Sequence, residues 1–227
     1  NKKIGPKILK QIKTEIKNIE KDSGKKFGDL KNPLLVSVRS GARVSMPGMM
    51  ETILNVGMTP DVATGLAQQT GNPGFAWDSY RRFIDLYGRI VCGIPKDSFG
   101  EIDQTYLQAA SVKTVDKLDF EQTKLLIADY IQLIEKYEGK PFSLNPRDHL
   151  LRSIEAVFHS WNSERAQLYR QRERIPSDLG TAVNIQSMVF GNLTDDSGTG
   201  VAFTRNPSTG ESGNYGDYLE RAQGADV

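Results

Sequence analysis

Several features that would indicate a function class are missing from these 227 residues. A single cysteine, Cys92, excludes an internal disulfide and a zinc site built on several cysteines, and it fits a reducing compartment. The 29 Lys and Arg exceed the 28 Asp and Glu by only one, so a net charge of +1 gives no whole-molecule field that could hold nucleic acid or an anionic membrane. No apolar run approaches the roughly 18 residues of a membrane span, and the first residues lack the apolar core expected of a signal peptide. We therefore expect a cytoplasmic globular protein with no nucleic-acid or membrane partner.

Catalytic sets are also scarce. The only histidines, His149 and His159, lie too far apart on one expected helix to form a metal pair at i and i+4. We expect a structural role for both, with a phosphorylated histidine as the alternative. Cys92 lies in the apolar run RIVCGI, which favours a buried structural thiol. Among the carboxylates, Glu211 and Asp217 are the candidates for a magnesium site.

Hydrophobic periodicity predicts helices over much of the sequence. In residues 6 to 21, apolar side chains recur at helical spacing among lysines, which predicts an amphipathic helix with a solvated face. The sequence TPD at residues 59 to 61 is a helix start signal, and another helix is expected after Asp119. These elements predict a helical module, between Thr59 and about Ser143, inserted in a mixed α and β fold.

The second half of the chain predicts a helix followed by strands. From residue 147 one long helix is expected to reach about residue 175, with Phe158 and Leu168 turned inward. Residues 183 to 190 then alternate as in a strand, and the turn-like GNLTDDSGTG leads to a short strand at residues 201 to 204. The pattern predicts a β-hairpin with a long loop. The small residues of DSGTG in this loop either fold backbone amides over a polyphosphate or form an ordinary exposed turn.

The segment SVRSGARVSMPGMMETILN, residues 37 to 55, is the first candidate for binding phosphate. It leaves a predicted buried strand, and it brings Arg39, Arg43, two hydroxyl groups and Gly41 within seven residues. Arginine offers a planar fork of donors that matches phosphate, and glycine lets backbone N–H groups approach it. The alternative is a structural turn, because the segment is neither a Walker A loop nor G-x-G-x-x-G. Residues 49 to 55 are expected to begin a helix or to cover a base with methionines.

Five long strings, in this order, resemble the pyruvate phosphate dikinase family: SVRSGARVSMPGMMETILNVGM, NPGFAWDSYRRFIDLYG, VFHSWNSERAQLYR, GTAVNIQSMVFGN and SGTGVAFTRNPSTGE. The resemblance covers residues 32 to 227 and implies an α+β fold of the ATP-grasp type, truncated at both ends, with an inserted helical subdomain. It makes residues 1–58 and 145–187 two parts of the first ATP-grasp subdomain, 59–144 the helical insert, and 188–227 the start of the second subdomain. The missing initial Met also leads us to expect a fragment of a longer protein.

The resemblance implies an activity for the parent protein. Members of the family use ATP and Mg²⁺ to transfer a pyrophosphoryl group to a histidine, release AMP, and pass one phosphoryl group to phosphate and the other to pyruvate. The implied partners are ATP or AMP, a swivelling phosphohistidine domain and a barrel that binds pyruvate or phosphoenolpyruvate, in a homodimeric parent. The fragment alone is expected to be inactive. The alternative is a non-catalytic module that uses the same loops to bind an anion or a protein.

The resemblance also assigns site residues, motif by motif. Arg39 of SVRSG and Arg82 of YRRFI match the family's catalytic, phosphate-contacting arginines. The other nucleotide contacts lie on a strand beside the adenine and on a loop over the phosphates, namely Gln186, Met188, Val189, Thr199 and Gly200. The family's lysine is expected before Asn1 and its magnesium ligands beyond Val227, so no metal ligand is expected within the chain. This weakens Glu211 and Asp217, as does GDYLERAQGAD, which departs from the family's usual GEYLINAQGED.

Overall fold

The computed structural model describes residues 4–224 and 226, so that positions 1–3 of the first predicted segment and 225 and 227 of the last lie outside the described residues. Helices and strands are both present, which confirms the predicted α+β class. Contacts between residues divide the chain into two compact units, Asn1–Met188 and Val189–Val227.

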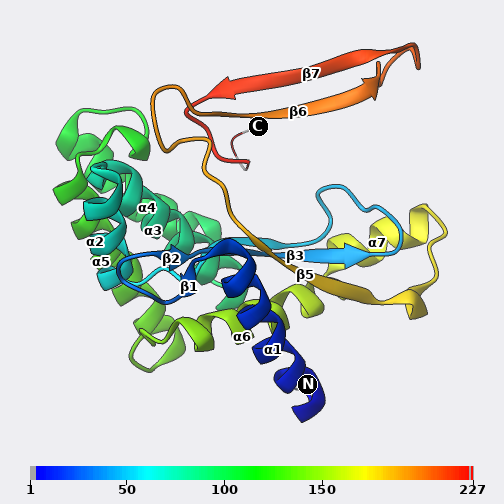
Figure 1. Ribbon diagram of the computed structural model, residues 1–227, viewed down its shortest axis with the longest axis horizontal. Coiled ribbons are helices and arrows are strands. Elements are labelled where there is room, and N and C mark those ends of the chain that lie inside the picture. Colours follow the sequence, from blue (N-terminus) through cyan, green and yellow to red (C-terminus); the bar gives the residue numbers. More distant parts are fainter. Residues whose placement is uncertain (1–3, 225, 227) are drawn as a thin grey trace. The chain divides into compact units, whose positions relative to one another are not determined.

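The first unit is built on an antiparallel sheet of three strands in the order β4-β3-β5. The strands are β3 (Val36–Ala42), β4 (Thr52–Val56) and β5 (Thr181–Ser187). Val38 lies directly opposite Ile53 of β4 and Ile185 of β5, so these three side chains point to one face of the sheet. Helix α6 (Pro146–Ser160) packs against all three strands on this apolar face (Figure 1).

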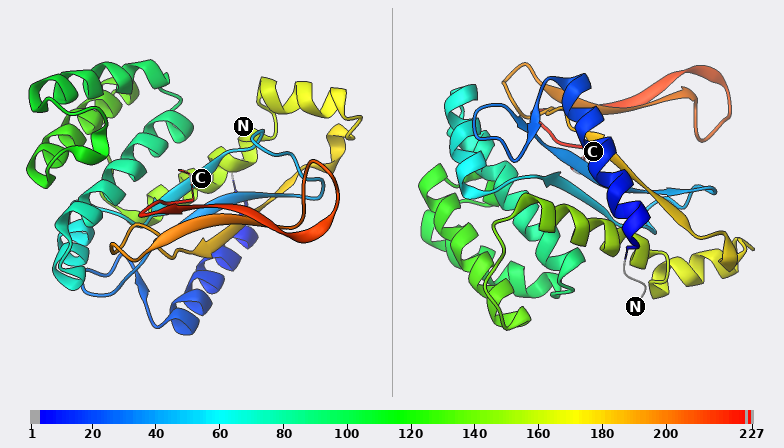
Figure 2. Two further views of the ribbon diagram at one scale, coloured as in Figure 1. Left: turned by 90° about the horizontal axis from the view of Figure 1, so that it is seen from above. Right: turned by 60° about the horizontal axis from the view of Figure 1, so that its bottom comes forward.

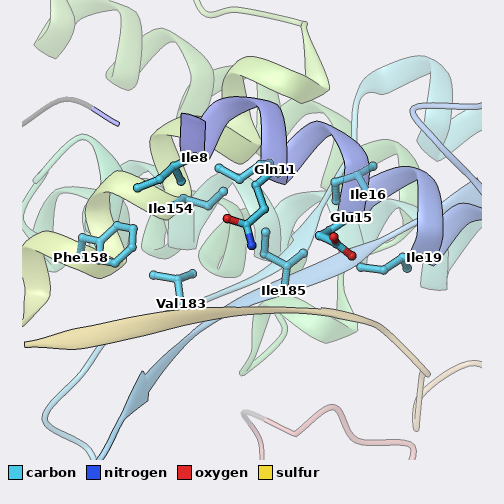
Figure 3. A pocket seen from close by; sticks show the side chains of 10 residues that line it. Ile8, Gln11, Glu15, Ile16, Ile19, Ile154, Phe158, Val183 and Ile185 are labelled. Atoms are coloured by element: carbon cyan, nitrogen blue, oxygen red, sulfur yellow. The ribbon is translucent and has the colours of Figure 1, made fainter. Parts of the chain in front are cut away.

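Helix α1 (Pro6–Ser23) confirms the amphipathic helix predicted for residues 6 to 21. Its apolar side chains face α6 and β5 across an apolar groove of about 270 Å³, which Figure 3 shows from close by. None of its residues is buried, although four isoleucines line the groove. The short parallel strands β1 (Lys26–Phe27) and β2 (Pro33–Leu34) then lead into β3.

The helical module begins where its capping residues predict. Thr59 caps α2 (Pro60–Thr70) by accepting a hydrogen bond of 3.2 Å from the Val62 amide. Asp119 forms a capping box with Gln122 at the start of α5 (Phe120–Glu138). The remaining helical elements of the module are α3 (Pro73–Leu86), the π-helical turn Tyr87–Val91 that continues it, α4 (Lys96–Ala110) and the 3₁₀ turn Val115–Lys117. Figure 2 shows these helices gathered at one end of the sheet.

The prediction of one long helix from residue 147 to about residue 175 is wrong. The structure has two helices, α6 and α7 (Glu164–Arg172), separated at residues 161–163. Ser163 starts α7 by accepting a hydrogen bond of 3.3 Å from the Ala166 amide, which no residue inside a continuous helix would do. Leu168, predicted to face inward, is 58% exposed because the break changes the direction of the helix. A 3₁₀ turn, Ser177–Leu179, leads on to β5.

The prediction of a hairpin between residues 183–190 and 201–204 is also wrong. In the second unit, β6 (Gly198–Arg205) pairs with β7 (Ser212–Glu220), whereas β5 pairs with β3 of the first unit. The turn between β6 and β7 is closed by a hydrogen bond of 2.9 Å from the Asn206 amide to the Glu211 carbonyl. The polar stretch before β6 therefore belongs to the second unit and does not close a hairpin between β5 and β6. Among the described residues, no helix is both long and apolar enough to cross a membrane.

Candidate functional site

The face of the sheet opposite α6 is polar. Arg39 of β3 lies directly opposite Thr52 of β4 and Asn184 of β5, and Ser37 lies opposite Gln186. Because directly opposed residues of antiparallel strands point to the same side, these five side chains share one face. It gathers hydroxyl, amide and guanidinium groups, which can bind a polar, anionic ligand.

Arg39 is the free positive charge of this face. Its side chain is exposed, and within residues 4–224 and 226 it makes no hydrogen bond or ion pair. Two residues further along the strand, Gly41 closely adjoins Asn184: a Cβ at Gly41 would lie 2.9 Å from the Nδ2 atom of Asn184. An anion can pair with Arg39 without first breaking a salt bridge. Glycine at position 41 leaves room for the Asn184 side chain on this face.

The loop that follows β3, residues 43–51, is anchored to the protein. Met46 is buried against Trp161 in a small apolar cluster. Trp161 is itself fixed, because its Nε1 donates to the Ser177 carbonyl at 3.2 Å and the guanidinium of Arg170 lies 4.1 Å from its ring centroid. The loop therefore anchors the end of β3, and with it the backbone at Arg39, while the Arg39 side chain stays free.

Residues 49–55 do not begin a helix, which corrects one of the two alternatives predicted for them. Residues 52–56 form β4, in which Ile53 and Val56 are completely buried. These β-branched side chains fit a pleated, buried strand better than a helix. Met49 and Met50 pack against the cluster around Met46.

The three residues predicted to flank the adenine lie at the end of β5. Gln186 is exposed on the polar face. The Met188 amide donates to the Leu35 carbonyl at 3.0 Å, and the Met188 sulfur accepts from the Asn55 amide at 3.1 Å. Val189 is 93% exposed and begins the second unit. Met188 is thus held in place, while the contact of all three with adenine stays a prediction.

Thr199 and Gly200 lie in a strand, which corrects the prediction that they belong to a loop. Both are part of β6, where Thr199 pairs with Leu219 and Gly200 with Tyr218. The Thr199 hydroxyl also donates to the Ala222 carbonyl at 2.5 Å. The sequence did not reveal that Thr199 and Gly200 belong to a strand, because its partner, β7, is identified only from the pairing in the structure. A role of these two residues in covering phosphates stays a prediction.

Arg82 lies on α3, which packs against β4. Its Nε donates to the Oδ2 atom of Asp78 at 2.7 Å, and Arg81 donates to the Oδ1 atom from Nε at 2.9 Å and from Nη2 at 2.6 Å. Burial acts to raise the pKa of Asp78, but the charges and hydrogen bonds of the two arginines outweigh it and hold that pKa below its usual value. Asp78 therefore stays ionised at neutral pH.

The other titratable candidates have structural surroundings. His149 is completely buried among the rings of Phe83, Tyr87 and Phe142, and this burial lowers its pKa. The imidazole therefore stays neutral at pH 7, which agrees with the structural role expected for it. Burial likewise raises the pKa of the Cys92 thiol to about 12, so Cys92 is a poor nucleophile at neutral pH.

The described part of the chain offers no magnesium site of its own. Within it, no three His, Cys, Asp or Glu side chains are grouped so that they could hold a metal ion. Glu211 lies just before β7, and Asp217 lies within β7 opposite Val201. The residues present therefore do not by themselves fit a divalent cation.

Two residues of the site were missed from the sequence. Asn184 shares the polar face with Gln186, and the alternation of polar side chains along β5 was the signal for it. Asp78 holds Arg81 and Arg82, and its spacing of three and four residues from them on a helix would have predicted the contact.

Comparison with known proteins finds one family over nearly the whole chain. Residues 3–221 match the family described as the AMP/ATP-binding domain of pyruvate phosphate dikinase. The pyruvate, phosphate dikinase of Clostridium symbiosum is 50% identical over 227 residues, which are 100% of this chain and 26% of that protein. That of Giardia intestinalis is 48% identical over 98% of the chain and 26% of its own length, and the chloroplastic protein of Mesembryanthemum crystallinum is 47% identical over 100% and 24%. The chain thus spans about a quarter of the length of these curated relatives.

Proposed function

Because this chain belongs to the pyruvate phosphate dikinase family, as its AMP/ATP-binding domain, we propose that it binds ATP on the polar face of its three-stranded sheet. The phosphates lie against Arg39, with Arg82 as a second phosphate contact, and the adenine lies beside Gln186 and Met188. The assignment of Val189, Thr199 and Gly200 to the same nucleotide rests on the family motifs.

This proposal depends most on the exposure of Arg39 and on its lack of an ion-pair partner among the described residues. An exposed arginine without a partner among the described residues, on a face of hydroxyl and amide groups, is a site for an oxyanion. The other face of the sheet is covered by α6 and carries apolar side chains such as Val38 and Ile185, so it offers no comparable site.

For the longer protein we propose the reaction of the family. ATP, phosphate and pyruvate are interconverted with AMP, pyrophosphate and phosphoenolpyruvate, through a phosphohistidine on another domain. Arg39 and Arg82 would oppose the negative charge that develops on the transferred phosphoryl groups. Mg²⁺ is implied by the family, but the described residues do not form a site for it, and we assign no step to a metal ion. A cytoplasmic location and the division into subdomains stay predictions.

A titration of the 227-residue chain with ATP tests the proposal. Amide shifts in the ¹⁵N spectrum are expected to gather at residues 37–43, 52 and 184–188. Replacing Arg39 with Ala should raise the Kd by about tenfold or more, because a charge-assisted hydrogen bond is lost. The matched control is Arg147→Ala, since Arg147 is also an exposed arginine but lies in the first turn of α6, on the other side of the sheet.

Three outcomes separate the proposal from its alternative. No shift at millimolar ATP would contradict a preformed nucleotide site. Equal effects of the two arginine variants would remove Arg39 from it. Binding of inorganic tripolyphosphate as tight as that of ATP, without shifts in β5, would favour a module that recognises only an anion.

A further inference from the structure

One carboxylate, Asp78, organises two consecutive arginines. Its Oδ1 atom accepts both hydrogen bonds from Arg81, and its Oδ2 atom accepts the bond of 2.7 Å from the Nε of Arg82. A carboxylate that receives three N–H groups in this way fixes the planes of both guanidinium groups.

The two arginines that Asp78 holds differ in exposure. The Arg81 side chain is only 8% exposed, so it faces the interior of the helical module, where Asp103 lies close enough to Arg81 and Asp85 for their charges to interact. The Arg82 side chain is 21% exposed. Of the two, Arg82 is the one that a ligand can reach. The buried Arg81 holds Asp78 in place through its two hydrogen bonds.

We propose that Asp78 is the positioning residue for Arg82, holding its Nε so that the guanidinium is ordered for a nucleotide phosphate before the nucleotide arrives. The inference rests on the proposed function, because it requires a phosphate at Arg82. A flexible arginine loses side-chain freedom when it binds, and a side chain that is already ordered avoids most of that entropic cost. Asp78 acts through Arg82 and does not touch the ligand.

An ordinary helix salt bridge is the simpler interpretation, and the same helix supplies a control for it. Asp85 and Arg89 are also four residues apart, and Arg89 Nη2 lies 2.5 Å from Asp85 Oδ2. The aspartate side chains are similarly exposed, 17% for Asp78 and 22% for Asp85. The pairs differ in the donor atom: Asp85 takes a terminal nitrogen, whereas Asp78 takes the Nε of Arg82 and shares its other oxygen with Arg81.

The test is a double-mutant cycle on ATP affinity in the 227-residue chain, with Asp78→Asn, Arg82→Ala and both together. Asp78→Asn keeps an acceptor oxygen for the buried Arg81, and it should raise the Kd by about fivefold to tenfold. In the Arg82→Ala background the same substitution should change the Kd less than about twofold, because its effect passes through Arg82. Asp85→Asn should leave the Kd unchanged.

A spectroscopic signature and a second variant keep the test independent of stability. The Arg82 Nε–H signal should be protected from exchange in the wild type without ATP, and it should lose that protection in Asp78→Asn but not in Asp85→Asn. Arg82→Lys retains the charge at a partly exposed position and removes the Nε–H, so it should reproduce the affinity loss of Asp78→Asn in a folded protein.

The outcomes are distinguishable from those of the proposed function. Additive effects of Asp78→Asn and Arg82→Ala, or an unprotected Nε–H in the wild type, would overturn the positioning role while leaving ATP binding intact. An Arg82→Ala variant with unchanged affinity overturns it as well, and the Arg39→Ala variant then decides whether ATP binds at the sheet. A wild type that does not bind ATP would overturn both proposals.

Discussion

Arg39 and Arg82 are the same residue type in two different surroundings. Arg39 projects from a strand, is exposed, and has no partner among the described residues. Arg82 projects from a helix, and its Nε is held by Asp78 beside the buried Arg81. The sheet thus supplies a free charge that a ligand must order, and the helical module supplies a charge that the fold has already ordered. Substitutions should therefore separate binding from stability, and they should do so differently in the two regions.

The largest effect is expected from Asp78→Ala in the helical module. It leaves the buried Arg81 without its carboxylate, so the free energy of unfolding should fall by about 3 kcal/mol. Urea denaturation measures this loss. Asp85→Ala should cost less, because the Arg89 side chain is 28% exposed and can be hydrated. Equal losses of unfolding free energy in the two variants would show that Asp78 stabilises the fold no more than the helix salt bridge of Asp85 does.

On the sheet side, Met46→Ala should have the next largest effect. It opens a cavity beside Trp161, so the free energy of unfolding should fall by about 2 kcal/mol. Amide hydrogen exchange should become faster in residues 43–51 and stay unchanged in α3. Met49→Ala, at a partly buried position of the same cluster, is the milder control. Faster exchange in both regions would mean that loop and helices unfold together.

A change in pH should have a weaker effect on stability. The effect should arise at His149 of α6, whose ring packs against Phe83 of α3. The folded pKa of His149 lies below its ordinary value because the ring is buried against Phe83 and Tyr87. The unfolded chain therefore takes up a proton near pH 6.5 that the folded chain does not, and stability falls as the pH drops through that range. Urea melts at pH 7.5 and pH 5.5 measure the loss. His149→Gln should reduce it, and an unchanged dependence in that variant would assign the loss to other groups.

The smallest effect on stability is expected from Arg39→Ala, the variant with the large expected effect on ATP affinity. Because Arg39 is exposed and makes no side-chain hydrogen bond or ion pair within the described residues, the free energy of unfolding should change by less than about 0.5 kcal/mol. Thermal melting without ligand measures this. A clear destabilisation would mean that Arg39 is ordered by contacts of its own, and the contrast with Arg82 would disappear.

Local signals explain most of what the sequence predicted. The starts of α2 and α5 follow from Thr59 and Asp119, whose side chains cap the helix from one neighbouring turn. The strand that carries Arg39 was likewise predictable, because the hydrophobic run before it indicates a strand, while the anion site at Arg39, two residues before Gly41, stays a prediction. Such signals need no knowledge of distant parts of the chain.

The failures concern contacts between residues far apart in the sequence. The partner of β6 is β7 and not the strand before it, because pairing is decided by whole strands and the turn at Asn206 closes the nearer pair. The predicted helix from residue 147 ran through Trp161, whose apolar side chain fits the helical period although it packs against Met46, 115 residues away in the sequence. Residues 52–56 form a strand because β3 lies beside them.

Helix α1 has a consequence for how quickly proteases degrade the chain. It directs its isoleucines to the groove beside α6 and β5, yet none of its side chains is buried, so little apolar surface must be exposed to release it. Segments of this kind open far more often than the core does, and a protease cleaves in proportion to the time that they are open. We expect trypsin to cut first at the lysines of α1, such as Lys10 and Lys13. The helix would then set the lifetime of the chain while contributing no residue to the polar face of the sheet.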